Sequence, residues 1–391
     1  MVDFTNTLIA FQGKTNHDLL RAKILFKAMG TPQVISMGKV LTNLSTTFHL
    51  PTGWVLRNTI YKQFVGGEDL EKIRPSLNTL MRKGVRAVLD YSAEGGDDEQ
   101  DILNTHYEVL KSFRFAKENP AVSFTVFKPS GLVRTDILEK KSMKKGELSP
   151  AEKIQFNEFT RRFMKLCEIA ANIKVPVLVD AEHYCYQDVI DELTEKAMKL
   201  YNKEYPYVFA TLQMYRHDRM DYLKRLDDMA QHEGFMPGIK FVRGAYMEQE
   251  REKAAREGYP DPICKNKRET DDNFDEGVKY VLERIDRFAV FVGTHNEESI
   301  RKAVELIDKL NIDRNDPRVM LSQLYGMSDI LTYNLANEGY RVCKYVPYAP
   351  VNKVLPYLIR RAEENTAIAG QTSRELELIN KEINRRKKMA V

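Results

Sequence analysis

The sequence predicts a closed (β/α)8 barrel, and three observations support this fold class. From about residue 85, short apolar runs rich in β-branched residues alternate with longer charged, amphipathic segments, as expected for strands buried on both faces of a parallel sheet. Eight such runs occur, each followed by a segment with helical periodicity, and eight is the number that closes a barrel. The main alternative is an open doubly wound sheet, which often carries a glycine-rich phosphate turn after its first strand. No GxGxxG or Walker motif follows any run.

The eight predicted strands are apolar runs of similar length along the chain. They are residues 85–92, 122–130, 175–183, 207–215, 239–246, 288–296, 319–326 and 341–350. The clearest helices between and after them cover residues 151–173, 296–310 and 351–368. The charged connection 247–273 is longer than most connections, so we expect an extra helix or excursion at the rim of the barrel.

Residues 1 to about 75 have a different character and are predicted to form a helical segment that packs on or near the barrel, with residues 76–391 as the catalytic domain. Short helices are expected at 18–30, 34–50 and 54–65. The first has basic residues opposite its apolar face, namely Arg21, Lys23 and Lys27. Such a helix either packs on a domain or lies on a membrane surface, and packing is the more frequent arrangement.

The composition is that of a globular protein, with 43% apolar and 30% charged residues among 391. A net charge of +4 without a dense basic stripe argues against nucleic acid as a partner. The four cysteines form no CxxC pair, which favours a reducing compartment. There is neither a secretion signal nor an apolar run of about 18 residues. We therefore expect a cytoplasmic protein, or one on the inner face of a bacterial membrane, or a mitochondrial protein if a targeting segment has been trimmed.

Polar residues gather at the predicted carboxyl ends of the strands, where barrel enzymes carry their catalytic groups. Single polar residues there mean little, because some polar residue begins every loop. The whole set, however, mixes amide, cation, carboxylate and hydroxyl groups, followed by an arginine pair. Its members are Lys128, Asp180, Gln213, Lys240, Arg243, Thr294, His295, Asn296, Gln323, Tyr348, Arg360 and Arg361.

Several of these residues suggest specific chemistry, each with a structural alternative. Lys128 and Asp180 are expected to pair at the barrel mouth, as a site or as a rim salt bridge, and Lys128 alone could form a Schiff base. Arg360 and Arg361 suit a carboxylate ligand, with Glu364 spaced to brace them, although an exposed charged helix face would look the same. The DAEHYC segment (180–185) lacks a second ligand cluster, so no metal site is predicted.

Several motifs together resemble the proline dehydrogenase family, most closely its stand-alone, mitochondrial-type branch. The longest is KYVPYAPVNKVLPYLIRRAEEN (344–365), which is similar to the family's YxxRRxxEN helix and the tyrosine loop before it. The others follow the family order across roughly residues 55 to 375. They are QFVGGE (63–68), LDYSAEG (89–95), DAE (180–182), KFVRGAY (240–246), GTHN (293–296) and QLYGMSD (323–329).

The resemblance implies a distorted (β/α)8 barrel with noncovalent FAD that oxidises L-proline to 1-pyrroline-5-carboxylate, the first step of proline catabolism. It implies a membrane quinone as electron acceptor and possible peripheral membrane contact. The implied catalytic residues are Asp180, Lys240, which would lie near flavin N5, and Lys128. The substrate would contact Lys128, Asp180, Tyr246, Tyr348, Tyr357, Arg360, Arg361 and Glu364, with Phe241 beside Tyr246 in the wall. The cofactor would contact Ala181, Gln213, Lys240, Arg243, Gly244, Ala245, Thr294, His295, Asn296 and Gln323.

One departure and three alternatives remain open at this stage. Many bacterial members carry arginine where Lys240 stands and lysine where Arg243 stands, which leaves the hydrogen bonding near the flavin ring less defined. A hydroxyproline dehydrogenase would have the same fold, but bulky Tyr348 would crowd a ring hydroxyl. A Schiff-base aldolase using Lys128 leaves the arginine pair unexplained. A catalytically silent barrel that only binds a ligand is disfavoured, because the positions of the family's site residues hold side chains that can perform the reaction.

Overall fold

The structure is a closed barrel of eight parallel strands, seen in a computed structural model that describes residues 2–29, 57–93, 98–351, 353–354, 357–358 and 371–389. The strand order around the barrel is the order along the chain. The strands are β1 Val85–Tyr91, β2 Val122–Phe127, β3 Val177–Val179, β4 Val208–Gln213, β5 Gly238–Val242, β6 Ala289–Gly293, β7 Val319–Leu324 and β8 Val342–Tyr348. The predicted fold class and all eight predicted strands are confirmed.

Every predicted strand is longer than the observed one, because its last residues already belong to the loop at the carboxyl end. The clearest case is β3, which ends at Val179, so that residues 180–183 leave the sheet. The parallel register aligns Phe127 with Val179 and Gln213 with Val242. The polar residues that follow these strands therefore emerge at one end of the barrel.

Aromatic side chains fill one layer of the barrel interior. Phe124, Phe209 and Phe291 come from β2, β4 and β6, and the ring of Phe124 meets the other two edge to face at 5.3 Å and 5.2 Å. Alternate strands thus contribute to one layer, as is usual in this fold. Gly238 on β5 leaves the required space, since a Cβ there would lie 2.7 Å from the Phe209 ring.

The helices fall into those before the first strand, those that follow strands, and one after the barrel. The first group is α1 Thr7–Phe11, α2 Asn16–Met29, the π-helical turn η1 Arg57–Tyr61, α5 Lys62–Phe64 and α6 Arg74–Met81. The second is α7 Glu99–Glu118, the 3-10 turn η2 Pro129–Leu132, α8 Thr135–Ser142, α9 Pro150–Ile173, α10 Tyr184–Tyr201, α11 Arg219–Glu233, α12 Met247–Glu257, α13 Lys267–Leu282, α14 Glu297–Lys309 and α15 Asp329–Asn337. The last is α17 Gln371–Met389.

Local sequence signals explain where the predicted helices begin. Helix α9 starts with a capping box, in which Ser149 and Glu152 each accept a hydrogen bond from the backbone of the other, and Pro150 occupies the first turn. Helix α14 starts at Asn296, whose side chain accepts from the Ser299 amide. Both helices match their predicted ranges within one residue. The predicted helices at 34–50 and 351–368 lie outside the described residues, apart from 351, 353–354 and 357–358.

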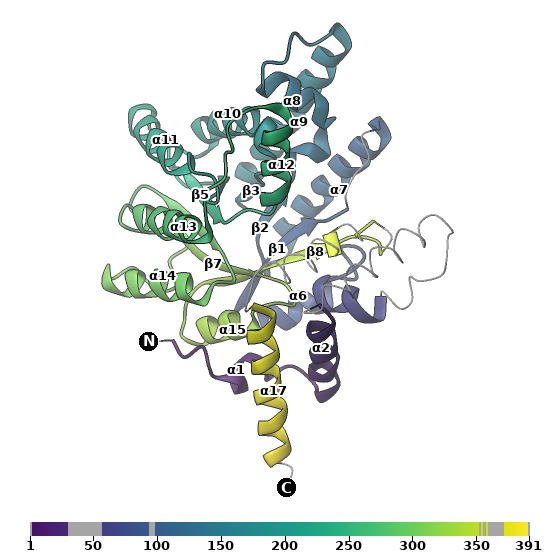
Figure 1. The fold of residues 1–391 in the computed structure, drawn as a ribbon, viewed down its shortest axis with the longest axis vertical. Coiled ribbons are helices and arrows are strands. Elements are labelled where there is room, and N and C mark those ends of the chain that lie inside the picture. Colours follow the sequence, from purple (N-terminus) through teal and green to yellow (C-terminus); the bar gives the residue numbers. More distant parts are fainter. Residues whose placement is uncertain are drawn as a thin grey trace. The chain divides into compact units, whose positions relative to one another are not determined.

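The long connection predicted at 247–273 contains α12 and an extended stretch. That stretch is fixed to the loop after β4, where the Cys264 amide donates to the Tyr215 carbonyl at 2.7 Å and Ile263 pairs with Arg216. In Figure 1, α12 lies beside α8 and α10, which agrees with the contacts of Lys253 to Glu139 and Cys185.

The chain divides into two compact units, one formed by residues 1–87, 92–94 and 323–391 and the other by residues 88–91 and 95–322. Within the first unit, α2 packs on α17 and buries Leu19 and Phe26. Packing of the N-terminal segment on the barrel itself stays a prediction. The proposed boundary near residue 75 stays a prediction.

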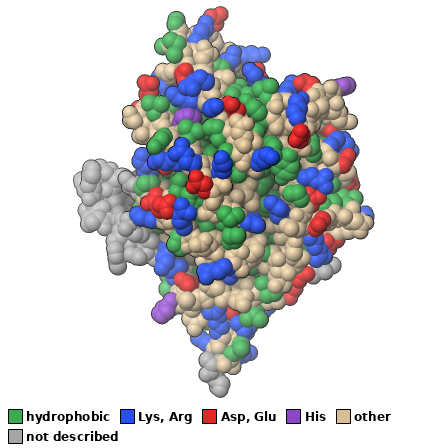
Figure 2. All heavy atoms as spheres, turned by 180° about the vertical axis from the view of Figure 1, so that it is seen from behind, with side chains coloured by type: hydrophobic (Ala, Val, Ile, Leu, Met, Phe, Trp, Pro, Cys, Tyr) green, Lys and Arg blue, Asp and Glu red, His purple; other side chains and the backbone are tan. Residues whose placement is uncertain are grey.

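The surface carries both signs of charge. Figure 2 shows Lys and Arg side chains interspersed with Asp and Glu over the face that it displays. Among the described helices, none is both long enough and apolar enough to cross a membrane.

Candidate active site

The strand ends of the second unit carry two lysine–carboxylate ion pairs. In the first, Lys128 follows β2 and its Nζ donates to Asp90 Oδ1 at 2.8 Å. The Asp90 side chain is only 4% exposed. Burial alone would lower the pKa of Lys128, but the carboxylates of Asp90, Asp180 and Glu182 outweigh that effect and raise the pKa. Lys128 is therefore held as an ammonium ion.

The second ion pair joins the loop after β3 to the middle of β5. Lys240 Nζ donates to Asp180 Oδ1 at 2.6 Å, and both side chains are largely buried. The sequence analysis predicted a direct ion pair between Lys128 and Asp180. In the structure, Lys128 pairs with Asp90 instead, and Asp180 pairs with Lys240. Because Asp180 contributes to the raised pKa of Lys128, the two pairs still form one electrostatic group.

Asp90 and Glu182 are site residues that the sequence analysis missed. Asp90 stands inside the apolar strand β1, and a carboxylate at a buried strand position was the available signal. Glu182 accepts hydrogen bonds from the amide and hydroxyl of Ser130. Burial raises the pKa of Glu182, with the Ser130 hydrogen bonds opposing the shift.

A second group of residues surrounds the start of α14. Arg243 donates to Asp271 at 2.7 Å, to Thr294 Oγ1 at 2.7 Å and to Ser299 Oγ at 2.9 Å. Thr294 Oγ1 also accepts from the Asn296 amide at 3.1 Å. The structure thus brings Arg243, Thr294 and Asn296 together, and their role toward a cofactor stays a prediction. A fixed guanidinium beside a helix N-terminus is an arrangement that suits an anion.

Gly244 occupies a backbone conformation that glycine favours, with φ of +127°. A Cβ at this position would lie 2.5 Å from the Tyr215 ring. The loop 243–246 therefore lies directly on Tyr215, and its next residue, Ala245, is exposed.

Two polar atoms inside the barrel lack a partner among the described residues. Thr211 Oγ1 and Gln213 Oε1 are both buried and make no hydrogen bond there. They stand two residues apart on β4, so they face the same side of the strand. Since buried polar atoms are usually hydrogen-bonded, these two indicate a place for a ligand or ordered water at the end of β4.

Phe241 is the one predicted wall residue that the structure contradicts. Its ring lies 6.4 Å from the Phe274 ring of α13, and a Cβ on Gly277 would meet it at 2.8 Å. Neighbouring residues of a strand point to opposite faces, so Phe241 faces the helices while Lys240 faces the barrel interior. The prediction for Phe241 was wrong for that reason.

Of the other predicted residues, Ala181, Tyr246 and His295 lie in the second unit, and the rest lie in the first unit or outside the described residues. Gln323 is the last residue but one of β7, is buried, and accepts from the Thr332 hydroxyl at 2.7 Å. Tyr348 ends β8 and is 1% exposed, and Tyr357 is buried as well. Arg360, Arg361 and Glu364 lie outside the described residues.

The side chains of the DAEHYC segment diverge. Glu182 turns to Ser130, His183 to Glu250, and Cys185 to Lys253. Over the part of the chain that the structure describes, no three His, Cys, Asp or Glu side chains gather as a metal site requires.

The fold and these strand-end groups define a (β/α)8-barrel protein with a buried, charge-balanced site. The family model for proline dehydrogenase matches residues 73–374. The chain belongs to the proline dehydrogenase family.

Curated relatives of the chain include three with broad coverage. A carbapenem antibiotics biosynthesis protein, CarD, of Pectobacterium carotovorum subsp. carotovorum is 35% identical, and the match covers 85% of both chains. Mitochondrial proline dehydrogenase 1 of Dictyostelium discoideum is 31% identical over 86% of this chain and 66% of its own length. Hydroxyproline dehydrogenase of Xenopus laevis is 28% identical over 96% and 88%.

A solved structure shares the fold. Proline utilization A from Bdellovibrio bacteriovorus, inactivated by N-propargylglycine, superposes with a TM-score of 0.71 at 21% identity. The match covers 92% of this chain and 38% of that protein.

Proposed function

We propose that this protein is a flavin-dependent proline dehydrogenase, which oxidises L-proline to 1-pyrroline-5-carboxylate in the first step of proline catabolism. The proposal rests on the two ion pairs Lys128–Asp90 and Lys240–Asp180 in the barrel. The chain that contains them belongs to this family. Noncovalent FAD, when bound, supplies the acceptor for the hydride that leaves the ring carbon next to the proline nitrogen.

The residues present fit such a cofactor. Thr211 Oγ1 and Gln213 Oε1, which are buried and have no partner among the described residues, can hydrogen-bond a polar ring. Gly244 lets the loop 243–246 lie directly on the Tyr215 ring, and Arg243 beside the start of α14 suits a pyrophosphate. We assign cofactor binding to Ala181, Gln213, Lys240, Arg243, Gly244, Ala245, Thr294, His295, Asn296 and Gln323.

In the proposed substrate site, Arg360 and Arg361 bind the proline carboxylate and Glu364 orients them, because guanidinium groups bind a carboxylate in a bidentate manner. Tyr246, Tyr348 and Tyr357 form the wall around the ring. Buried tyrosine rings exclude water from the reacting carbon, and Tyr348 and Tyr357 are both buried.

The two lysines control the protonation of the substrate. Hydride loss from the carbon next to nitrogen needs the nitrogen lone pair, so the amine must be neutral. Ammonium groups at Lys128 and Lys240 disfavour a second positive charge beside them. The Asp90 carboxylate keeps Lys128 protonated, and Asp90 and Asp180 hold the two lysine side chains in place.

A Schiff-base aldolase needs a lysine with a lowered pKa. The raised pKa of Lys128 and its bond to Asp90 argue against that alternative. Hydroxyproline dehydrogenase remains the second candidate function, because one relative bears that name. Buried Tyr348 favours proline, since a hydroxyl on the ring would need space beside it.

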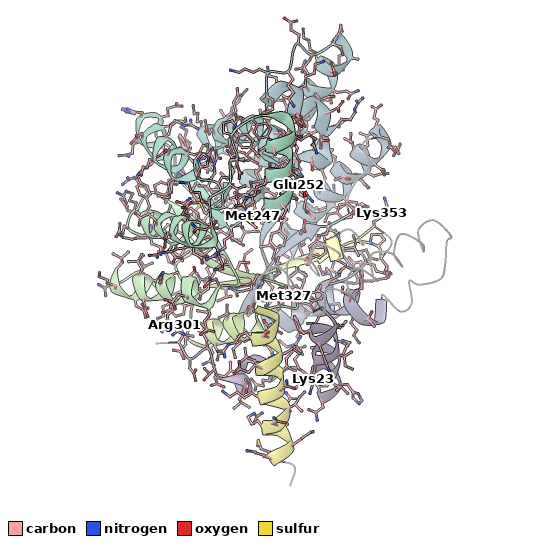
Figure 3. The ribbon with its side chains drawn as sticks, in the orientation of Figure 1. Lys23, Met247, Glu252, Arg301, Met327 and Lys353 are labelled. Atoms are coloured by element: carbon pink, nitrogen blue, oxygen red, sulfur yellow. The ribbon has the colours of Figure 1, made fainter. Side chains whose placement is uncertain are left out.

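We further propose a membrane quinone as the electron acceptor, reached by peripheral contact from the cytoplasm or, for a mitochondrial protein, from within the organelle. Helix α2 supports this proposal, because Leu20 and Ile24 are 52% and 61% exposed on the helix that carries Lys23 and Lys27 (Lys23 is labelled in Figure 3).

The test is the visible spectrum of the purified protein during anaerobic titration with L-proline. We expect a flavin spectrum that bleaches with L-proline and far less with trans-4-hydroxy-L-proline. Stronger bleaching by hydroxyproline would establish the second candidate. A protein that stays colourless after reconstitution with FAD would overturn the proposal.

A further inference from the structure

The loop after β3 contacts β5 through the ion pair Asp180–Lys240, and it contacts the loop after β5 as well. Three residues beyond Asp180, the ring of His183 lies against the ring of Tyr246, with centroids 4.4 Å apart and planes inclined by 33°. His183 Nδ1 also lies 3.2 Å from Glu250 Oε1. This second contact is therefore built from one imidazole, one phenol and one carboxylate.

Glu250 is a buried carboxylate in the first turn of α12, with 1% of its side chain exposed. Its Oε1 accepts from the Tyr184 amide at 2.9 Å as well as facing His183. Its Oε2 is buried and makes no hydrogen bond among the described residues. Burying a carboxylate is costly unless donors or a positive charge compensate it, so a glutamate kept here indicates a specific task.

Helix α12 begins immediately after Tyr246. Tyr246 is the residue that precedes the first turn, and its side chain does not cap the helix. Figure 3 labels Met247 and Glu252, which mark the first turns of this helix. Further along, Lys253 contacts Glu139 of α8 and lies 3.2 Å from Cys185 Sγ. The start of α12 is thus held by Glu250, and the orientation of Tyr246 depends on that anchor and on the His183 ring.

We propose that His183 and Glu250 are positioning residues that hold Tyr246 in the wall of the substrate pocket. The inference rests on the proposed function, because that function places Tyr246 beside proline. A wall residue acts mainly on binding, so loss of its support raises KM more than it lowers kcat.

The experiment measures steady-state kinetics with L-proline on the flavin-loaded full chain. We expect His183→Ala to raise KM about tenfold while kcat changes less than about twofold. We expect His183→Asn, which keeps an N–H close to the position of Nδ1, to recover about half of the lost affinity on a logarithmic scale. The matched control is His232→Ala, since His232 is exposed in the last turn of α11, and its KM should stay unchanged.

A double-mutant cycle separates positioning from general destabilisation. If His183 acts through Tyr246, His183→Ala should have no further effect on KM in a Tyr246→Ala background. The inference would be overturned if the effects of His183→Ala and Tyr246→Ala on KM were fully additive. It would also be overturned if His183→Ala and His183→Asn lost kcat equally and left KM unchanged. If L-proline does not reduce the flavin of the wild-type protein, the proposed function is overturned instead. The flavin absorbance and the melting temperature of each variant show whether it is folded.

Discussion

At the scale of single residues, Asp90 illustrates how one buried carboxylate sets the charge of its neighbour. Lys128 has a raised pKa because Asp90, together with Asp180 and Glu182, outweighs the effect of burial. A buried ion pair that loses one partner leaves the other charge uncompensated. The proposed chemistry needs that charge, so stability and activity should fall together when Asp90 is neutralised.

We therefore expect Asp90→Asn to lower the free energy of unfolding by about 2 kcal/mol and to reduce kcat/KM for L-proline by at least about tenfold. Urea denaturation and steady-state kinetics measure the two effects. Asp136→Asn is the control, because Asp136 pairs with Arg134 on an exposed surface and its loss should change neither quantity. An Asp90→Asn enzyme with wild-type kinetics would show that the Lys128 charge does not serve the reaction.

Gly244 is the second residue with a separate prediction. Alanine there requires a strained positive φ and places a methyl group 2.5 Å from the Tyr215 ring. We expect Gly244→Ala to cost about 2 kcal/mol of stability and to weaken FAD binding. Fluorescence titration with FAD and urea denaturation test both effects.

Gly146→Ala provides the control for Gly244, since Gly146 also has a positive φ but has open space where its Cβ would lie. The difference between the two variants isolates the steric clash from the backbone strain. Equal losses in both variants would mean that the contact with Tyr215 has no role.

At the scale of elements, α17 is fixed to the loop after β7 by a buried acid. Glu375 Oε1 accepts from the Ser328 amide at 2.6 Å. Burial, aided by the nearby charge of Asp329, raises the pKa of Glu375 to about 7. The folded state therefore binds a proton that the unfolded chain releases near its ordinary pKa of about 4.5.

This raised pKa makes one contribution to stability that is present at low pH and lost as the pH rises. Between about pH 4.5 and 7 the folded state holds more protons than the unfolded state, so stability should decline across that window. We expect the wild type to lose about 2 kcal/mol relative to Glu375→Gln on going from pH 5 to pH 8. Thermal unfolding at both pH values measures the difference.

Glu377→Gln is the matched control on the same helix, because the Glu377 side chain is 72% exposed. It should follow the wild type at both pH values. If Glu375→Gln and the wild type show the same change between pH 5 and pH 8, Glu375 is already ionised in the folded protein at pH 5.

The strand and helix predictions show what a sequence pattern can specify. Apolar runs located every strand, and caps such as Ser149 and Asn296 located the starts of α9 and α14. Phe241 shows the limit of prediction from a motif. The motif KFVRGAY does not say which face of the strand each residue occupies, and only the alternation of side chains along β5 places Phe241 toward the helices. The partners Asp90 and Glu250 could not be assigned, because each reaches across the fold to a residue distant in the chain.

At the scale of the whole molecule, the barrel depends on its aromatic layer. Phe124 contacts both Phe209 and Phe291, and the Lys240 ammonium lies 6.0 Å from the Phe291 ring. This layer therefore supports the site above it as well as the core.

We expect Phe124→Ala to lower the free energy of unfolding by about 4 kcal/mol, as is usual for a large aromatic removed from a packed interior. Tyr107→Ala is the control, since Tyr107 is 60% exposed on α7. Urea denaturation compares the two variants. A loss below about 1 kcal/mol would mean that the barrel closes over the cavity.

The contacts of Arg386 have a consequence for the order in which native contacts form while the chain is being synthesised. Arg386 donates to the carbonyls of Phe11 and Lys14, and Leu19 and Phe26 are buried where α2 packs on α17. Translation makes residues 2–29 long before their partner helix α17, which begins at residue 371. Residues 2–29 therefore gain these contacts only late in synthesis, and until then Leu19 and Phe26 lack the partner helix that buries them.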